Sequence, residues 1–121
     1  MITYQNYTDH PIRIINTKTG IMDALEPSRN PIRVTTLRTH TEPLPDGMQV
    51  VSVRHATVDL PPRKQNTIFV VSNYALHVIR DQYPERDDVV APDTSDDSAI
   101  KDRRGRIVAV RRLARNAGWQ P

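Results

Sequence analysis

Arginine side chains dominate the chemistry that this sequence can offer, and they gather near its end. Of the 17 Lys and Arg residues in the 121-residue chain, seven lie between positions 101 and 115. A guanidinium group keeps its charge at any working pH, and its fork donates two parallel hydrogen bonds that fit a phosphate. Arg111 and Arg112 are neighbours at the end of an expected strand, and side chains alternate along a strand, so these two point to opposite faces. Only one of them can therefore share a patch with Arg104 or Arg106. The candidate phosphate ligands are Arg104, Arg106, Arg111 and Arg112.

A block of carboxylates precedes these arginines. Positions 81–97 hold seven Asp and Glu residues against one arginine. Exposed ion pairs between the two blocks would contribute about 0–1 kcal/mol each and would leave roughly two or three arginines to hold an anion. Asp93 and Asp96 could accept hydrogen bonds from the hydroxyl groups of a sugar. The stretch 93–97 lacks the spacing and the closing glutamate of a calcium loop, so we expect no metal there.

Two aromatic residues, Phe69 and Tyr74, bracket an expected junction between a strand and a helix. At the start of a helix the backbone N–H groups point outward, so Tyr74 could stack on a base while the helix end holds a phosphate. Phe69 lies in an apolar run, and we expect it in the core, with stacking on the ligand as its second role.

The sequence shows no catalytic constellation. The absence of cysteine excludes disulfides and thiolate metal sites, and four isolated glycines do not make a phosphate-binding loop. The histidines stand far apart, without the short spacing of a zinc site or a readable carboxylate partner. We therefore expect no catalytic residue, no metal and no cofactor, and a binding protein instead of an enzyme. A phosphodiesterase that uses His10, His55 or His77 remains the alternative; the fourth histidine is His40.

The stretch 67–113 predicts the scaffold that positions these groups. The β-branched run Thr67–Val71 is typical of a strand buried on both faces. Ser72 or Asn73 can cap a following helix, and Pro84 ends it. The other elements expected here are the helix over 73–83, short strands over 89–91 and 107–110, and a polar loop over 92–102.

Residues 1–60 predict a β meander, because short alternating runs are separated by turn residues. Prolines 61 and 62 open a rigid connector to the second half, and residues 114–121 are expected to form a tail. The sequence thus predicts one small α+β domain, a mainly antiparallel sheet with one principal helix packed on it. The strands expected in the meander are 2–7, a hairpin of 12–16 with 21–25, 32–37, 48–53 and, past a bend, 55–60.

Composition restricts the partners. The net charge is only +3 and aromatic residues make up 5%, so a long nucleic acid would find few stacking platforms and would be repelled by the acidic block. The first residues lack the basic and apolar regions of a signal peptide, and no apolar run approaches the roughly 20 residues that span a bilayer. We expect a cytoplasmic protein without membrane contact.

Six segments scattered along the chain form one pattern: Asn6–Ile12, Leu60–Pro62, Ile68–Ser72, Arg86–Val89, Ala91–Thr94 and Gly105–Leu113. These segments resemble one family of small phage and bacterial proteins, the Thoeris anti-defence nucleotide sponges of phages. The resemblance implies a homo-oligomer in the host cytoplasm that sequesters cyclic ADP-ribose-type signals, or in some members cyclic oligonucleotides. The family does not cleave these ligands. It also implies that arginines near the C-terminal strand hold phosphates and that the Pro-containing acidic loop holds ribose or base. That loop here carries aspartates where the family pattern suggests asparagine or glycine, which leaves the ligand open.

These observations together predict a non-enzymatic, homo-oligomeric phage protein that binds a small cyclic nucleotide immune signal. Its arginines would pair with phosphates, its aromatic residues would stack the base, and its aspartates would take the sugar. The rival functions are a phosphodiesterase that degrades such a signal and a protein-interaction module of a phage.

Overall fold

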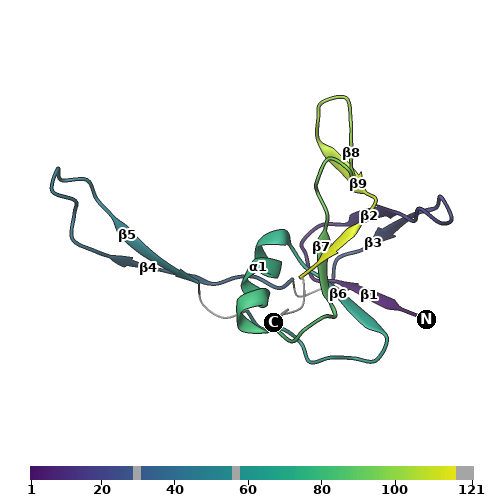
Figure 1. Ribbon diagram of the computed structural model, residues 1–121, viewed down its shortest axis with the longest axis horizontal. Helices are drawn as coiled ribbons and strands as arrows, with labels where there is room; N and C mark the ends of the chain where they lie inside the picture. The colour runs from purple at the N-terminus through teal and green to yellow at the C-terminus, as the bar shows by residue number, and fades with distance from the viewer. Residues whose placement is uncertain (29–30, 56–57, 117–121) are drawn as a thin grey trace, which may run out of the picture.

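The computed structural model describes residues 1–28, 31–55 and 58–116. These residues form one helix and ten strands in mixed sheets, a small α+β domain that is mostly β (Figure 1). The predicted fold class is confirmed. Both antiparallel and parallel pairings occur, so the sheets are less uniform than the meander suggested. In the described part of the chain, no helix is long and apolar enough to cross a membrane.

The first sheet contains a parallel unit built from consecutive elements. Strand β6 (Thr67–Val70) leads into helix α1 (Asn73–Gln82), which returns the chain to β7 (Val89–Pro92), parallel to β6. Strand β1 (Thr3–Asn6) pairs parallel to β6, and β10 (Leu113–Arg115) pairs antiparallel to β7. The carboxyl ends of β6 and β7 and the start of α1 therefore meet at one edge of the sheet.

Helix α1 begins and ends close to the expected positions. Ser72 is the N-cap, and its side chain accepts a hydrogen bond of 3.1 Å from the amide of Ala75. At the other end, the amide of Tyr83 donates to the carbonyl of Ile79, before Pro84 stops the helix. The buried residues of α1 are Ala75, Leu76 and Ile79, whose helical spacing places them on one face, against the core.

The two central strands are buried on both faces. Phe69 and Val89 pack with α1 in the larger apolar cluster, whereas Val70 and Val90 pack with Ile12 of the second sheet. The alternation of side chains along β6 and β7 sends one set to the helix and the other to that sheet. The molecule's body is thus three layers, helix, sheet and sheet. The burial of this strand on both faces confirms the prediction from the apolar run at 67–71, whereas the second sheet as a separate layer was not predicted.

The second sheet has the order β3-β2-β9-β8. The predicted hairpin is confirmed as β2 (Ile12–Ile15) with β3 (Met22–Leu25), and β9 (Ile107–Val110) is the expected strand. Two expectations were wrong. Strand β8 (Ala99–Lys101) interrupts the predicted polar loop, because it can pair with the open edge of β9. Strand β10 occupies residues assigned to the tail from position 114, because β7 has an open edge; residues 117–121 lie outside the described part.

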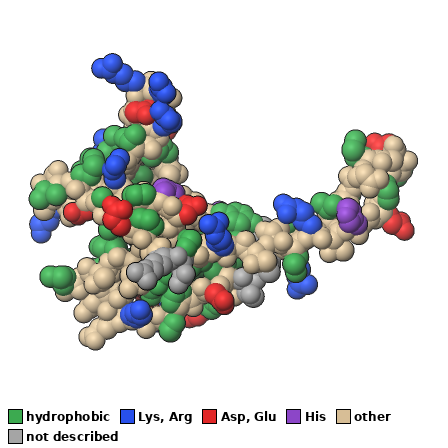
Figure 2. Space-filling view, turned by 180° about the vertical axis from the view of Figure 1, so that it is seen from behind, with side chains coloured by type: hydrophobic (Ala, Val, Ile, Leu, Met, Phe, Trp, Pro, Cys, Tyr) green, Lys and Arg blue, Asp and Glu red, His purple; other side chains and the backbone are tan. Residues whose placement is uncertain are grey.

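A long two-stranded ribbon, which we call the arm, projects from the body (Figures 1 and 2). It consists of β4 (Thr36–His40) and β5 (Val51–His55), paired only with each other in the described structure. The strands predicted over 32–37 and 48–53 are therefore shifted toward the C-terminus. The reason for the first shift is packing, since Ile32 and Val34 lie against the main core outside any strand. Val58–Leu60 are not in a strand, and residues 56–57 lie outside the described residues.

One ion pair is enclosed beside the core, at the entry to β7. Arg86 donates to both carboxylate oxygens of Asp88, at 2.8 and 2.9 Å, and its guanidinium carbon lies 5.8 Å from the centre of the Phe69 ring. Burial alone would raise the pKa of Asp88, but the hydrogen bonds from Arg86 and from its own amide, with the charge of Arg86, outweigh burial and lower that pKa.

We expect Asp88→Asn to lower the free energy of unfolding by about 3 kcal/mol at neutral pH, because it leaves the buried Arg86 charge without its partner. The deficit should shrink as the pH falls through about 4 and below, since the depressed pKa of Asp88 stabilises the fold only while the carboxylate is ionised. Urea titrations of both proteins at several pH values measure this.

Asp96→Asn is the control for this experiment. The Asp96 side chain is 96% exposed and lies 3.5 Å from Lys101, so its removal should change stability by less than about 0.5 kcal/mol. Equal changes in the free energy of unfolding for the two substitutions would contradict the stabilising effect that we assign to burial of the Arg86–Asp88 pair.

Candidate functional site

A groove crosses the N-terminal end of α1, and we call it the α1 groove. It consists of two adjoining hollows of about 290 Å³ each, which share Thr8, His10 and Ser72. One lobe opens toward the second sheet and the other toward the segment that leads into the arm. The carboxyl edge of parallel strands, beside a helix start, is the place where open α/β sheets bind ligands.

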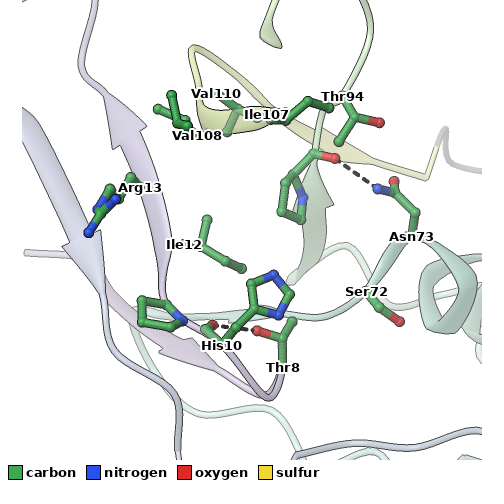
Figure 3. A pocket seen from close by; sticks show the side chains of 13 residues that line it. Thr8, His10, Ile12, Arg13, Ser72, Asn73, Thr94, Ile107, Val108 and Val110 are labelled. Carbon is green, nitrogen blue, oxygen red and sulfur yellow. Dashed lines mark hydrogen bonds between the residues drawn. The ribbon is translucent and has the colours of Figure 1, made fainter. Parts of the chain in front are cut away.

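The first lobe has an apolar wall and a polar margin (Figure 3). Strand β9 and Ile12 form the wall, and both Ile107 and Val108 remain more than two-fifths exposed. On the opposite side, Asn73 donates a hydrogen bond of 3.1 Å from Nδ2 to the carbonyl of Pro92, which ties the helix start to the end of β7. Thr94 completes the polar margin. Arg13 also lines this lobe, from β2, but Figure 3 shows its side chain on the other side of Ile12, away from Asn73 and Thr94.

The second lobe continues past His10 along the other side of the helix start. It is lined by the segment 31–34, which includes Arg33, and by Tyr74 and Asp9. The Tyr74 side chain is about half exposed. The sequence prediction that Tyr74 stands at a helix start beside a possible anion site is therefore consistent with its position in the groove, while its contact with a ligand stays a prediction.

Asn6 holds the turn that separates the two lobes. This residue is buried, and its Oδ1 accepts hydrogen bonds from the amide of Thr8 at 2.9 Å and from its hydroxyl at 2.6 Å. Its Nδ2 donates to the carbonyls of His10 and Leu25. A single amide thus fixes the backbone of the turn and joins it to β3, so the groove is preformed at its centre.

His10 is paired with its neighbour. Its Nδ1 lies 3.1 Å from Oδ1 of Asp9, and this hydrogen bond is the main reason that the pKa of Asp9 is lowered. The sequence reading found no carboxylate partner for any histidine, so this pair was missed. Both side chains are exposed, which makes the pair accessible from the groove.

The four predicted phosphate ligands do not converge in one place. Arg104 and Arg106 lie at the turn between β8 and β9, where both amides donate to Oδ1 of Asp102 (Figure 2 shows basic side chains at this tip). Arg111 lines a separate hollow, of about 320 Å³, with residues of β1, β2 and β3. Arg112 is engaged elsewhere, with Nη2 2.9 Å from Asp93.

Acidic side chains pair with some of the basic side chains between 101 and 115. Such ion pairs were considered from the sequence as the alternative to anion binding. Asp93 accepts from Ser95 and from Arg112, and these groups together lower its pKa, the amide and hydroxyl of Ser95 having the largest effect. Asp96 stands near Lys101 at the surface. Contact of either aspartate with a sugar stays a prediction, and Asp93 would have to exchange its present partners to make it.

The stacking role considered for Phe69 is wrong. Phe69 has no exposed surface, and its ring is 5.6 Å from that of Tyr7 in the core. Its core assignment is confirmed. Among the described residues, no group of three or more His, Asp or Glu side chains could hold a metal ion.

Sequence reasoning missed most residues of the α1 groove, because they come from separate segments. Thr8, His10 and Arg13 precede and enter β2, Arg33 lies before the arm, and Thr94 follows β7. The available signal was the stretch Asn6–Pro11, whose Asn, Thr and Asp side chains before a proline are typical of a tight turn.

Comparison with known proteins gives no relative for this chain. No family model, no curated protein and no solved structure matches it.

We expect Asn6→Ala to lower the free energy of unfolding by about 2–3 kcal/mol, since it removes several buried hydrogen bonds and leaves their backbone partners unsatisfied. The control is Asn16→Ala. Asn16 makes the same kind of side-chain contact, accepting from the amides of Lys18 and Thr19, but in an exposed turn where water can replace it. Thermal and urea unfolding should therefore show a cost of about 1 kcal/mol or less for the control. Equal costs would contradict the role given to Asn6.

Proposed function

We propose that this protein binds a small cyclic nucleotide, a cyclic ADP-ribose isomer or a cyclic oligonucleotide, in the α1 groove and sequesters it without cleavage. The observation that carries the proposal is the pair of adjoining lobes that meet at the start of α1. Each lobe alone is near the lower limit of about 300 Å³ for ligand pockets, so a ligand with two ends, one in each lobe, fits best.

The charges of the groove favour an anion. The partial positive charge of the α1 start lies between the lobes. Of the residues that the structure describes, one arginine lines each lobe, Arg13 the first and Arg33 the second. Among the described residues that line the two lobes, Asp9 is the one carboxylate, and its bond to His10 occupies one of its oxygens. Phosphates near the helix start, with the side chain of Arg33 or Arg13 turned toward them, suit this arrangement.

The uncharged walls favour the rest of a nucleotide. The exposed side chains of Ile107 and Val108 give the first lobe an apolar surface for a base or sugar. Tyr74 offers a ring in the second lobe, where a base could stack.

The sequence resemblance supports the first lobe as a ligand site, although the arginines that it implies as phosphate ligands do not line that lobe. Its segments are scattered in the chain, but several of them supply residues of the first lobe: Asn6–Ile12, Ile68–Ser72, Ala91–Thr94 and Gly105–Leu113. We accordingly propose a phage-type anti-defence role in the host cytoplasm, as a homo-oligomer, with the main phosphate contacts at the α1 groove instead of at Arg104 and Arg106.

The contact between His10 and Asp9 favours a second candidate, a phosphodiesterase that degrades the same ligand. A carboxylate beside Nδ1 fixes the tautomer of a histidine and leaves Nε2 as a base. This function would use the same groove and differ only in the fate of the ligand.

Binding is tested by calorimetry against cyclic ADP-ribose isomers and cyclic di- and trinucleotides. We expect at least one to bind, and Arg13→Gln to weaken that affinity about tenfold or more, through loss of a charged hydrogen bond. The matched control is Arg104→Gln, an exposed arginine outside the groove, which should leave the affinity unchanged. Absence of binding to every nucleotide would contradict the proposed function. If Arg104→Gln lost binding while Arg13→Gln kept it, the ligand site would lie at the arginines near the β8–β9 turn instead of in the α1 groove.

Sequestration and cleavage are separated by the fate of the ligand. After long incubation with the protein and release by heating, we expect the nucleotide to be recovered unchanged, with the same result for His10→Gln. Chromatography with mass detection measures this. Product formation by the original protein, lost in His10→Gln while binding persists, would establish the phosphodiesterase instead.

A further inference from the structure

The protein exposes much more surface than a compact monomer of its size. Its solvent-accessible area is 9142 Å², whereas a compact monomeric protein of 13.8 kDa is expected to expose about 6,600 Å². The excess, roughly 2,500 Å², exceeds the 800 Å² or so that each partner of a stable dimer buries. The arm is the visible source of extended surface (Figure 1).

The arm has no core of its own. Leu37, Val51 and Val53 are each between two-fifths and three-fifths exposed, although they lie in paired strands. An isolated two-stranded ribbon is marginally stable in water, and it needs further strands or a packed face to become firm. The described body offers the arm neither, since β4 and β5 pair only with each other.

The register of the arm shows which backbone groups are left for a partner. The amide of Thr41 donates to the carbonyl of Val50, so this pair, just beyond the last pair His40↔Val51, is a hydrogen-bonded one. Hydrogen-bonded and non-hydrogen-bonded pairs alternate along an antiparallel ladder. On β5, the N–H and C=O groups that point away from β4 are therefore those of Val51, Val53 and His55.

This edge is complementary to itself. If two β5 strands run antiparallel and overlap along their whole length, Val53 faces Val53 of the second copy, and the outward groups of Val51 meet those of His55. Each such pair can exchange both N–H···O bonds, and the central one places two apolar, β-branched side chains together. The same full overlap of two β4 strands would place Arg38 opposite Arg38, and like charges directly opposite destabilise a sheet.

We propose that the arm is a dimerisation element that pairs through β5 with β5 of a second copy of this chain, forming a four-stranded sheet with a two-fold axis at Val53. The pairing closes the exposed β5 edge and covers part of the apolar surface of the arm. It rests on the proposed function only in giving its homo-oligomer a specific interface. Flat calorimetric traces would contradict ligand binding and leave the β5 pairing standing, whereas a single-chain mass would contradict the pairing and the homo-oligomer but not ligand binding.

Cysteine crosslinking tests the pairing directly, because the chain has no cysteine of its own. Two residues in a hydrogen-bonded antiparallel pair have Cα atoms about 5.5 Å apart, within the range that a disulfide spans. Val53→Cys should therefore give a disulfide-linked dimer under mild oxidation. The matched control is Arg38→Cys, the residue opposite Val53 in the same arm, which would lie on the outer strand of the new sheet, about 14 Å from its copy.

The mass of the unmodified protein in solution, from light scattering or sedimentation, should be at least twice 13.8 kDa. Val53→Lys should halve that mass, because it places two charges opposite each other, while Val53→Thr should not. A single-chain mass for the unmodified protein at tens of micromolar would overturn the proposal. So would equal or faster crosslinking of Arg38→Cys, which would assign the contact to β4 or to random collision. The crosslinking result decides even if Val53→Lys fails to fold.

Discussion

The enclosure of β6 and β7 on both faces is the constraint on which the rest of this structure depends. A strand can be covered by a helix on one side and by a second sheet on the other only if almost all its side chains are apolar, and the run from Ile68 to Val71 meets that demand. The unit β6–α1–β7 then fixes where the helix starts. Both lobes of the α1 groove adjoin that helix start. The candidate site contains residues from distant segments, but its position depends on this one local supersecondary unit.

Local patterns in the sequence were enough to predict the three elements of this unit, but not that β6 and β7 run parallel, and non-local pairing explains what they missed. The apolar run, the Ser72 cap and Pro84 act over a few neighbouring residues. Strands β8 and β10 carry little pattern of their own, and they become strands because β9 and β7 have open edges nearby in space. The position of β4 was missed for the opposite reason, since Ile32 and Val34 are apolar at alternate positions but use that surface on the core.

The candidate site could be predicted only in part. Composition drew attention to the arginines between 101 and 115, but it could not show that the carboxylate of Asp93 already holds Arg112 or that Arg106 lies 3.5 Å from Asp102. Conversely, Thr8 and Arg33 become partners in a groove only after the chain folds. Tyr74 is the groove residue whose position was predicted from the sequence, because the helix cap Ser72 lies only two residues before it.

The segment 31–34 belongs to two parts of the molecule at once. It lines the second lobe beside Tyr74, and it leads directly into β4 at the root of the arm. If a ligand in this lobe changed the direction in which the arm leaves the body, it would also change self-association through the arm. Thermodynamic linkage makes any such influence mutual: whatever free energy ligand occupancy adds to self-association, self-association must return to ligand affinity in equal measure.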